Sequence, residues 1–413
     1  MEIPPAEPET PRTTPPVEEE QVEQLREEPR RQHFKDPSWM TRNIRKDNRI
    51  ALLLHGDVKA SSAPVTTTDG YAFLASYSWK QSTAPTIYVP GTPPKWSPPP
   101  LPTQLEKDQE GHWVDQHGHR TPRFQFEPIF QALTIMNPNV AFDNVDIVVN
   151  RNSLLKLYSF ASFKRHPQFY LDLDMIGKTL FISRRESRAK THIQDGYGGT
   201  FENKFTSKDP ELADAEGHHR IIQYRLGRLN IVVRIEADAY FSDEHAENSN
   251  TNTPNEVFLN FLREMQPASA AIAHTRHIQT NVIPKGTLMP HHRTAELKSN
   301  NDKRGATTQA WFGRTRNLIF GGNKKGLITS TSTKQLQDKD FADWAEKNQL
   351  HLRRLAWLLE EMRTAVKEKT KGAAVLVATE KGAPLQIFEA FQSFGALPKP
   401  VIKRFWSEDV AEG

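Results

Sequence analysis

Residues 220–241, "RIIQYRLGRLNIVVRIEADAYF", restrict the fold more than any other segment. Two apolar runs flank Leu-Gly-Arg, a pattern that predicts a β-hairpin. Successive side chains of a strand point to opposite faces, so the apolar residues at odd positions from 231 to 239 share one face. Glu236 and Asp238 then lie side by side on the other face. The chain must therefore form a sheet that buries one side of this arm and carries two adjacent carboxylates on the other.

The remaining periodic segments predict further strands together with several helices. Strands are predicted at 71–79, 86–90, 145–150, 169–186, 309–330 and 373–379. Residues 197–205, "YGGTFENKF", read as a short extended segment. The clearest helix is 341–370, because leucines and a methionine recur there at helical spacing. Many strands with interspersed helices indicate an α/β (α+β) fold in which mixed β-sheets are flanked by helices.

Composition sets the domain organisation. Residues 1–36 are rich in Pro and Glu and contain few large apolar side chains, so we expect a disordered tail. The rest, 37–405, is predicted to be one domain with a polar insertion at about 242–290. The chain has no cysteine, which excludes disulfides and thiolate metal sites and favours an intracellular protein. It has no apolar run of 18 residues, so no membrane-spanning helix is expected.

Three groups of acidic residues are candidates for a metal site. If Glu236 and Asp238 face the interior, their charges repel each other and lose hydration, and a divalent cation would remove that cost. Glu296 and Lys298 are also two residues apart, so they share a face if "AELKSN" is a strand. Glu202 follows a glycine pair that permits close approach of backbone or substrate. Oxygen ligands of this kind suit Mg²⁺ or Mn²⁺.

Other candidates in the sequence have a simpler interpretation. Glu106 and Asp108 repeat the Glu-x-Asp spacing, but they lie in a polar segment and are predicted to be solvated surface. The histidine pairs 218–219 and 291–292 are adjacent in sequence, would point to opposite faces of a strand and have no cysteine partners. We therefore interpret these histidines as surface or loop residues rather than as a zinc site.

The order of the acidic motifs resembles the DXO-type decapping exoribonucleases, which share the PD-(D/E)XK nuclease core. The resemblance covers about residues 125–365. It rests on Arg151 in "VVNRNSLLKL", Glu202 in "GGTFE", Glu236 and Asp238 in "IEADA", and Glu296 and Lys298 in "ELK". The stretch "WFGRTRNLIFGGNKKG" and the leucine-rich helix after it also match.

The resemblance implies a metal-dependent hydrolase of RNA 5′ ends. It would remove an incomplete cap, a 5′ pyrophosphate or an NAD cap, with 5′-to-3′ exoribonuclease activity as a further implied activity. The implied catalytic residues are Glu236, Asp238, Glu296 and Lys298. The implied ligands of one or two Mg²⁺ or Mn²⁺ ions are the side chains of Glu202, Glu236, Asp238 and Glu296 and the backbone carbonyl of Leu297.

Substrate contacts and partners follow from the same resemblance. Arg151 would hold the 5′ phosphates, with a structural ion pair as an equal alternative. Glu202 is also placed at the substrate. The family's glutamine after its tryptophan has no clear counterpart, and Arg314 stands nearby as a substrate-binding candidate. The implied partners are an RNA 5′ end and a 5′-to-3′ exoribonuclease, and the nucleus is favoured over the cytoplasm.

One departure keeps a second function open. The family has a short connection between its Glu-x-Asp and Glu-apolar-Lys motifs, whereas here residues 239–295 intervene. This insertion favours an alternative in which the chain keeps the fold as a non-catalytic RNA-binding or exoribonuclease-activating partner. Retention of all four acids and Lys298 favours the enzyme. A nuclease directed at DNA on the same core is not distinguished by the acids.

Overall fold

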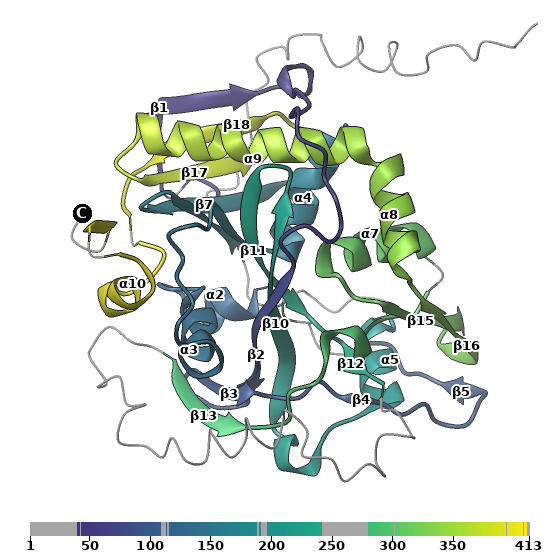
Figure 1. Cartoon of the computed structure of the whole chain (residues 1–413). Helices are drawn as coiled ribbons and strands as arrows, with labels where there is room; N and C mark the ends of the chain where they lie inside the picture. The colour runs from purple at the N-terminus through teal and green to yellow at the C-terminus, as the bar shows by residue number, and fades with distance from the viewer. Residues whose placement is uncertain are drawn as a thin grey trace, which may run out of the picture.

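Two mixed β-sheets organise the computed structural model of the chain (Figure 1). The structure describes residues 39–41, 43–108, 113, 115–187, 190, 196–241, 280–300, 302–393, 395–407 and 409–410. Within these ranges the large sheet has 11 strands in the order β1-β18-β17-β7-β8-β6-β11-β10-β2-β3-β13. The small sheet has 7, in the order β5-β16-β15-β14-β12-β4-β9. Parallel pairs such as β6–β11 stand beside antiparallel ones such as β10–β11, as predicted for an α/β protein of mixed sheets.

The strands divide between the sheets as follows. The large sheet contains β1 (Ile44–Leu53), β2 (Ala72–Lys80), β3 (Thr86–Pro90), β6 (Ile147–Asn150), β7 (Phe169–Ile176), β8 (Thr179–Arg185), β10 (Ala215–Leu226), β11 (Leu229–Glu236), β13 (Asn281–Lys285), β17 (Ala373–Ala378) and β18 (Leu385–Ala390). The small sheet contains β4 (Lys95–Trp96), β5 (Thr103–Gln104), β9 (Thr206–Ser207), β12 (Ala239–Tyr240), β14 (Thr294–Lys298), β15 (Asn317–Lys324) and β16 (Leu327–Gln335).

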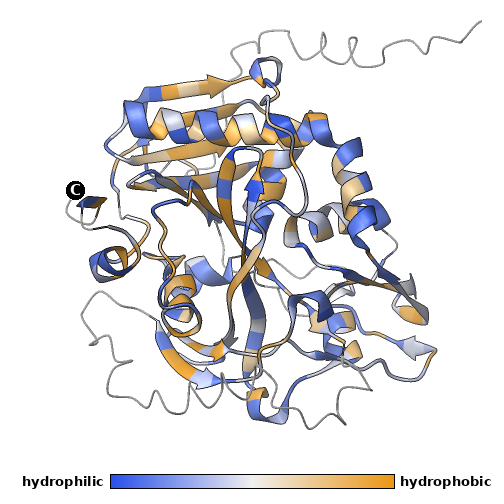
Figure 2. Cartoon of the chain, viewed as in Figure 1, coloured by the Kyte–Doolittle hydropathy of each residue, from blue (hydrophilic) through white to orange (hydrophobic). Residues whose placement is uncertain are grey.

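Helices cover both faces of the large sheet. The helices are α2 (Gln116–Arg120), α3 (Glu127–Met136), α4 (Arg151–Ala161), α5 (Gly198–Phe205), α7 (Lys303–Gly313), α8 (Asp338–Lys347), α9 (Gln349–Lys369) and α10 (Lys399–Phe405), with 3-10 turns at His55–Asp57, Pro210–Leu212 and His291–Arg293. Helices α4, α7, α8 and α9 share one hydrophobic core with the sheet, and α3 and α10 share a second core on the other face. Figure 2 shows apolar residues concentrated on the strands between these layers.

The β10–β11 hairpin confirms the pattern that the sequence predicted. Its register pairs Leu226 with Leu229 at the turn and His219 with Glu236 at the far end. Ile231 belongs to the core beneath α4 and α9, whereas Val232 belongs to the core beneath α3. The alternation therefore holds along the strand as far as Glu236, where β11 ends.

The predicted extended segment at 197–205 is wrong, because residues 198–205 form helix α5. Phe201 and Phe205 are four residues apart, so they lie on one helical face, and both are buried in the core of the small sheet. Residues four apart share a face on a strand as well, so the spacing of the phenylalanines did not distinguish the two structures.

The predicted helix 341–370 is two helices, α8 and α9, which meet at Asn348. The Asn348 side chain donates to the Trp344 carbonyl at 2.8 Å and accepts from the Tyr158 hydroxyl at 3.0 Å. Asparagine competes with helical backbone bonding through such contacts, which explains the interruption.

Two sequence predictions lie partly or wholly outside the described residues. They are the disordered tail at 1–36 and most of the insertion at 242–290. The described end of the insertion, Asn281–Lys285, forms strand β13, which pairs in parallel with β3 at the sheet edge. In the part of the chain that the structure describes, no helix is long and apolar enough to span a membrane.

Replacement of Leu359 by alanine should lower the free energy of unfolding by about 2–5 kcal/mol. Leu359 is fully buried on α9 in the core of the large sheet, so the shorter side chain leaves a cavity. Urea denaturation followed by circular dichroism measures the change. Glu360→Ala on the exposed face of the same helix is the control and should shift stability by less than about 0.5 kcal/mol. Equal losses in both variants would contradict the assigned faces of α9.

Candidate active site

The four predicted acidic residues meet where the two sheets join. Glu236 is the last residue of β11, and Asp238 lies in the link to β12. Glu296 is on β14 of the small sheet, and Glu202 is on α5, which packs against that sheet. A cavity of about 1130 Å³ opens here, and Glu202, Glu236 and Asp238 line it together with Lys298. The motifs that the sequence separates are thus brought to one place.

The chain changes sheets between Glu236 and Ala239, and this change positions both carboxylates. The amide of Ala237 donates to the carbonyl of His218 at 2.9 Å, which is the last link to the large sheet. The amide of Leu297 then donates to Oδ2 of Asp238 at 2.8 Å, which ties the link to β14. Leu297 itself is buried in the core of the small sheet. One carboxylate therefore belongs to each sheet, and both face the cavity.

Burial and mutual repulsion raise the pKa values of three of these acids. Burial, followed by the charge of Asp238, raises the pKa of Glu236 to about 7. Burial, followed by the charge of Glu296, raises the pKa of Asp238 to about 6. Burial, followed by the charges of Asp238 and Glu236, raises the pKa of Glu202 well above its usual value. The Glu236 side chain nevertheless remains accessible from the cavity, so this carboxylate can meet a ligand.

Glu296 is the fully buried member of the cluster and has three polar partners. Arg151, the first residue of α4, forms an ion pair with Oε1 of Glu296. Gln309 on α7 donates to Oε2 at 2.6 Å, and the ammonium of Lys298 lies 3.5 Å from the same oxygen. The ion-pair alternative for Arg151 is therefore what the structure contains. Gln309, two residues before Trp311, was missed because nothing in the sequence links it to the acids.

Lys298 lies at the end of β14 beside the carboxylates. Burial acts to lower the pKa of its ammonium, but the charges of Glu296 and Asp238 outweigh burial, and the pKa is raised. The lysine therefore remains a cation at the rim of the cluster, within reach of a molecule held there.

The donor chemistry of this cluster fits a hard divalent cation. Four carboxylates that lie this close together repel one another, and a cation that joins them removes this repulsion. Among the described residues, however, no three carboxylate or imidazole side chains are already arranged as a metal cage. Glu296 is held by Arg151, and Asp238 is held by the Leu297 amide, so their oxygens are engaged elsewhere. Asp238 already lines the cavity, whereas Glu296 would have to turn toward it to bind a cation there.

The interpretation of Asp108 as solvated surface is wrong. Asp108 is buried and accepts hydrogen bonds from the amide and hydroxyl of Thr200, both at 2.8 Å. Its other oxygen is 3.4 Å from the Gly199 amide. These amides belong to the first turn of α5, where a carboxylate satisfies free donors and favours the helix dipole. Asp108 thus fixes the helix that carries Glu202, whereas Glu106 is exposed.

The prediction that Arg314 contacts substrate is not supported by its position. Arg314 is buried, ends α7 in a left-handed conformation and stacks its guanidinium over Tyr224 and Trp311, each 4.2 Å from the ring centroid. It does not line the cavity. Arg314 instead has a structural role, because it stacks on the neighbouring Trp311.

The histidine pair 218–219 is likewise not on the surface, because both residues are buried and line the cavity. The register of β10 with β2 shifts between Glu216 and His218, so the strand is bulged immediately before the pair. Such a bulge leaves no clear signal in the sequence. His292 is exposed as predicted, whereas the ring of His291 lies between Arg220 and the Gly313 carbonyl.

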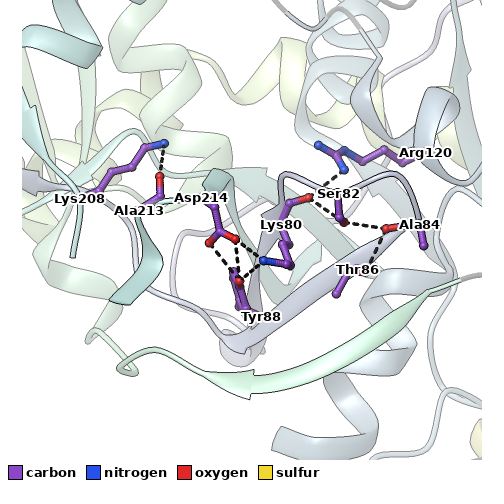
Figure 3. A network of polar contacts seen from close by, with 9 residues as sticks. All are labelled: Lys80, Ser82, Ala84, Thr86, Tyr88, Arg120, Lys208, Ala213 and Asp214. Carbon is purple, nitrogen blue, oxygen red and sulfur yellow. Dashed lines mark hydrogen bonds and ion pairs between the residues drawn. The ribbon is translucent and has the colours of Figure 1, made fainter. Parts of the chain in front are cut away.

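Another wall of the cavity is fastened by a polar network (Figure 3). The ammonium of Lys80 on β2 donates to the Tyr88 hydroxyl at 2.8 Å and pairs with Asp214. Tyr88 also donates to Asp214, at 3.0 Å. Lys208, which lines the cavity, donates to the Ala215 carbonyl at 2.6 Å. The segment after α5 is thereby attached to strands β2 and β3.

Asp108→Ala should lower the free energy of unfolding by about 1–2 kcal/mol, because the first turn of α5 loses its carboxylate partner. Urea denaturation checks this value. Glu106→Ala, which removes the exposed partner of the same Glu-x-Asp pair, should change it by less than about 0.5 kcal/mol. Similar effects of both substitutions would show that Asp108 does not cap the helix.

In EDTA, the free energy of unfolding of Glu236→Gln should increase relative to that of the wild type as the pH rises. Because the pKa of Glu236 is raised to about 7 in the folded protein, the wild type loses stability between about pH 4.5 and pH 7, where the unfolded chain already ionises. Glutamine does not titrate, so this loss is absent in the variant. Urea denaturation at several pH values measures the difference, and a difference independent of pH would contradict the assignment. Mn²⁺ at neutral pH should stabilise the wild type more than the variant.

Comparison with known proteins identifies both the family and the fold. The model of a family described as "Domain of unknown function (DUF8563)" matches residues 48–406. No curated protein matches the chain.

Among solved structures, Rai1 from S. pombe is 14% identical, with a TM-score of 0.52, and the match covers 82% of this chain and 99% of that one. The same protein in complex with 3′-FADP gives the same values. Rai1 from Scheffersomyces stipitis, in complex with (3′-NADP)+ and calcium ion, is 10% identical, with a TM-score of 0.51 over 88% of this chain and 98% of that one. These likenesses confirm, for the fold, the resemblance on which the motifs were interpreted. The chain therefore belongs to the family described as a domain of unknown function (DUF8563), and it has the fold of Rai1.

Proposed function

We propose that this chain is a metal-dependent hydrolase of RNA 5′ ends. The observation that carries the proposal is the convergence of Glu202, Glu236, Asp238 and Lys298 at an open cavity where two sheets join, with Glu296 buried beside Lys298. The proposed reactions are removal of an incomplete cap, a 5′ pyrophosphate or an NAD cap, with 5′-to-3′ digestion as a further activity. The Rai1 fold and the nucleotide complexes of its relatives support this assignment.

The proposed cofactor is Mg²⁺ or Mn²⁺. Calcium in the Rai1 structure from Scheffersomyces stipitis supports a divalent ion in this fold. In this chain the ion would be held by the side chains of Glu202, Glu236, Asp238 and Glu296 and by the carbonyl of Leu297. When bound, such an ion lowers the pKa of a water molecule and stabilises negative charge on the phosphate.

The chain's own residues would perform the remaining tasks. Lys298 remains cationic beside Glu296, so it can orient an attacking water or a phosphate oxygen. Arg151 holds one oxygen of Glu296 and lies near the Glu236 carbonyl at 3.4 Å, so it positions both acidic residues. Its contact with a 5′ phosphate stays a prediction. Ion pairing to Glu296 leaves Arg151 lining the cavity, where further donors can reach a phosphate.

Other lining residues suit the end of a single RNA strand. Lys107, Arg184 and Lys190 add cationic side chains to the cavity, and these attract phosphates. Trp113 also lines it and provides an aromatic face on which a base can stack. We further propose that residues 37–405 act as one catalytic domain, since both sheets contribute to the same cavity.

A non-catalytic role is the second candidate, and one observation favours it. Glu296 is neutralised by Arg151, and no metal cage is preformed among the residues that the structure describes. In that case the cavity would bind an RNA end without hydrolysis, and a 5′-to-3′ exoribonuclease would be the partner. Activity of the purified chain separates the two candidates.

The purified wild type should release product from 5′-triphosphate, NAD-capped or 5′-monophosphate RNA in Mn²⁺ or Mg²⁺ and not in EDTA. Glu236→Ala, Asp238→Ala should reduce the initial rate by about 100-fold or more, because two metal ligands are lost. Denaturing gels and mass spectrometry of the products measure the reaction.

The control carries Glu360→Ala, Glu361→Ala, which removes two acidic side chains from the exposed face of α9 and should retain the wild-type rate. Absence of product from every RNA would reject the hydrolase in favour of the binding role. Full activity of the double variant at 236 and 238 would reject the site but not the reaction.

A further inference from the structure

Beside Glu236, the cavity contains a cradle of polar atoms around Gly217. A Cβ atom added to Gly217 would lie 3.0 Å from Oε1 of Glu236, 3.2 Å from Oε1 of Gln116 and 3.4 Å from Nε2 of His219. Three polar side chains from different elements thus surround one small space. Gly217 has a φ of +65°, in the left-handed region that favours glycine, so glycine both permits the bend and keeps the space open. We call Gln116, His117, Gly217 and His219 the Gly217 subsite.

Two elements hold these side chains in place. His219 on β10 pairs directly with Glu236 on β11, so both side chains project from the same face of the large sheet. Gln116 and His117 begin helix α2, whose first turn is capped by the Asp115 carboxylate accepting from the Gly118 amide at 2.8 Å. The subsite is therefore built on paired strands and a capped helical turn.

The hydrogen-bonding role of His117 is fixed by its neighbour. The indole N–H of Trp79 donates to Nδ1 of His117 at 3.2 Å. An indole nitrogen only donates, so Nδ1 must accept, and the proton of the neutral ring lies on Nε2. Burial, followed by the charge of Arg234, holds the pKa of His117 well below its usual value, which keeps the ring neutral. His117 thus presents an N–H donor, and it lines the cavity.

Two further polar atoms of the subsite are buried and lack a partner. Nε2 of Gln116 and Nε2 of His219 have no hydrogen bond among the described residues, although both side chains are more than nine-tenths buried. Leaving a buried polar group unsatisfied costs about 1–3 kcal/mol. Buried polar groups in native proteins normally have a partner, so a ligand or water must complete these contacts.

The chemistry of the subsite favours a planar, uncharged ligand with both donors and acceptors. The four residues of the subsite include no lysine or arginine, and the Glu236 carboxylate lies at the rim, so the subsite itself is poorly suited to a phosphate. His117 and His219 pack edge to face, with ring centroids 4.5 Å apart, beside Tyr77. A glutamine amide offers an adjacent donor and acceptor, which match the N6 amine and a ring nitrogen of adenine.

We propose that the Gly217 subsite binds the hydrogen-bonding edge of the base of the 5′-terminal nucleotide, with adenine preferred. The proposal rests on the proposed function, because it takes the phosphate of that nucleotide to lie at the neighbouring acids. The amide of Gln116 pairs with the base edge, and His117 donates to a ring nitrogen. The side chains that hold the ion and those that recognise the base are then adjacent through Glu236.

The test compares two short RNAs in EDTA, where hydrolysis does not interfere. Both carry a 5′ monophosphate and a 3′ fluorophore, and they differ only in the first base, which is adenine or unsubstituted purine without the N6 amine. Fluorescence anisotropy should show that the wild type binds the adenine RNA about fivefold more tightly, the value of one hydrogen bond. Gln116→Leu should bind both RNAs equally, and more weakly than the wild type binds either, because both contacts of the amide are lost.

His119→Leu is the matched control, because His119 is exposed on the same short helix and does not line the cavity. This variant should keep the fivefold preference. His117→Phe provides a second variant and should weaken the binding of both RNAs, because both bases keep the ring nitrogen to which His117 donates. Equal binding of the two RNAs by the wild type, no binding of either, or a preference retained in Gln116→Leu would each overturn the proposal.

Free AMP and the purine nucleoside 5′-monophosphate form a further arm of the same experiment. Discrimination between these free nucleotides without discrimination between the RNAs would overturn recognition of an RNA end. The outcome is also separable from the proposed function. Base preference without hydrolysis in Mn²⁺ would reject the hydrolase and keep the subsite. Hydrolysis without base preference would keep the hydrolase and reject the subsite.

Discussion

The site depends on the passage of one strand from the large sheet to the small sheet. At Ala237 the backbone still bonds to β10, and at Asp238 the side chain already bonds to the backbone of β14. A strand that continued in one sheet would place both acidic residues against a single surface. Because the chain changes sheets, Glu236 and Asp238 lie where two separate cores end, and β14 and α5 can add Glu296 and Glu202 from the second sheet.

This arrangement concentrates negative charge that the protein must compensate. Arg151 provides part of the compensation through its ion pair with Glu296. The guanidinium passes close to Gly313 in α7, and this explains the glycine there. A Cβ atom on Gly313 would lie 2.8 Å from Nη1 of Arg151, so a larger residue would displace the guanidinium. A buried carboxylate that lost such a partner would be strongly destabilising. The first residue of α4 and the last residue of α7 are therefore both adapted to one acid on β14.

The sequence was informative where a residue's role follows from its own strand or motif. The alternation around Ile231 and Val232 predicted which side of β11 carries the acids, and the order of the motifs predicted which acids meet. It was uninformative where a role comes from a distant segment. Asp108 and Glu106 have the same spacing as Glu236 and Asp238, and only the folded chain shows that Asp108 reaches the first turn of α5.

The errors at α5 and at Arg314 have the same origin. Phe201 and Phe205 specify a helix only because a core lies beside them, and Arg314 is stacked because Tyr224 comes from another element.

Some buried polar atoms near the acids have hydrogen-bond partners within the protein and others have none. The first kind supports the site, and the second kind can recognise a ligand. Around Glu296 both carboxylate oxygens have partners, from Arg151 and Gln309, so the protein fixes the position of this acid. Around Gly217 the nitrogen atoms of Gln116 and His219 have none among the described residues. A protein gains nothing in stability from leaving such atoms unpaired, since an apolar side chain of similar shape would avoid the cost. The unpaired atoms beside Glu236 are thus the ones free to contact a ligand, and the paired ones fix the acids to which that ligand is presented.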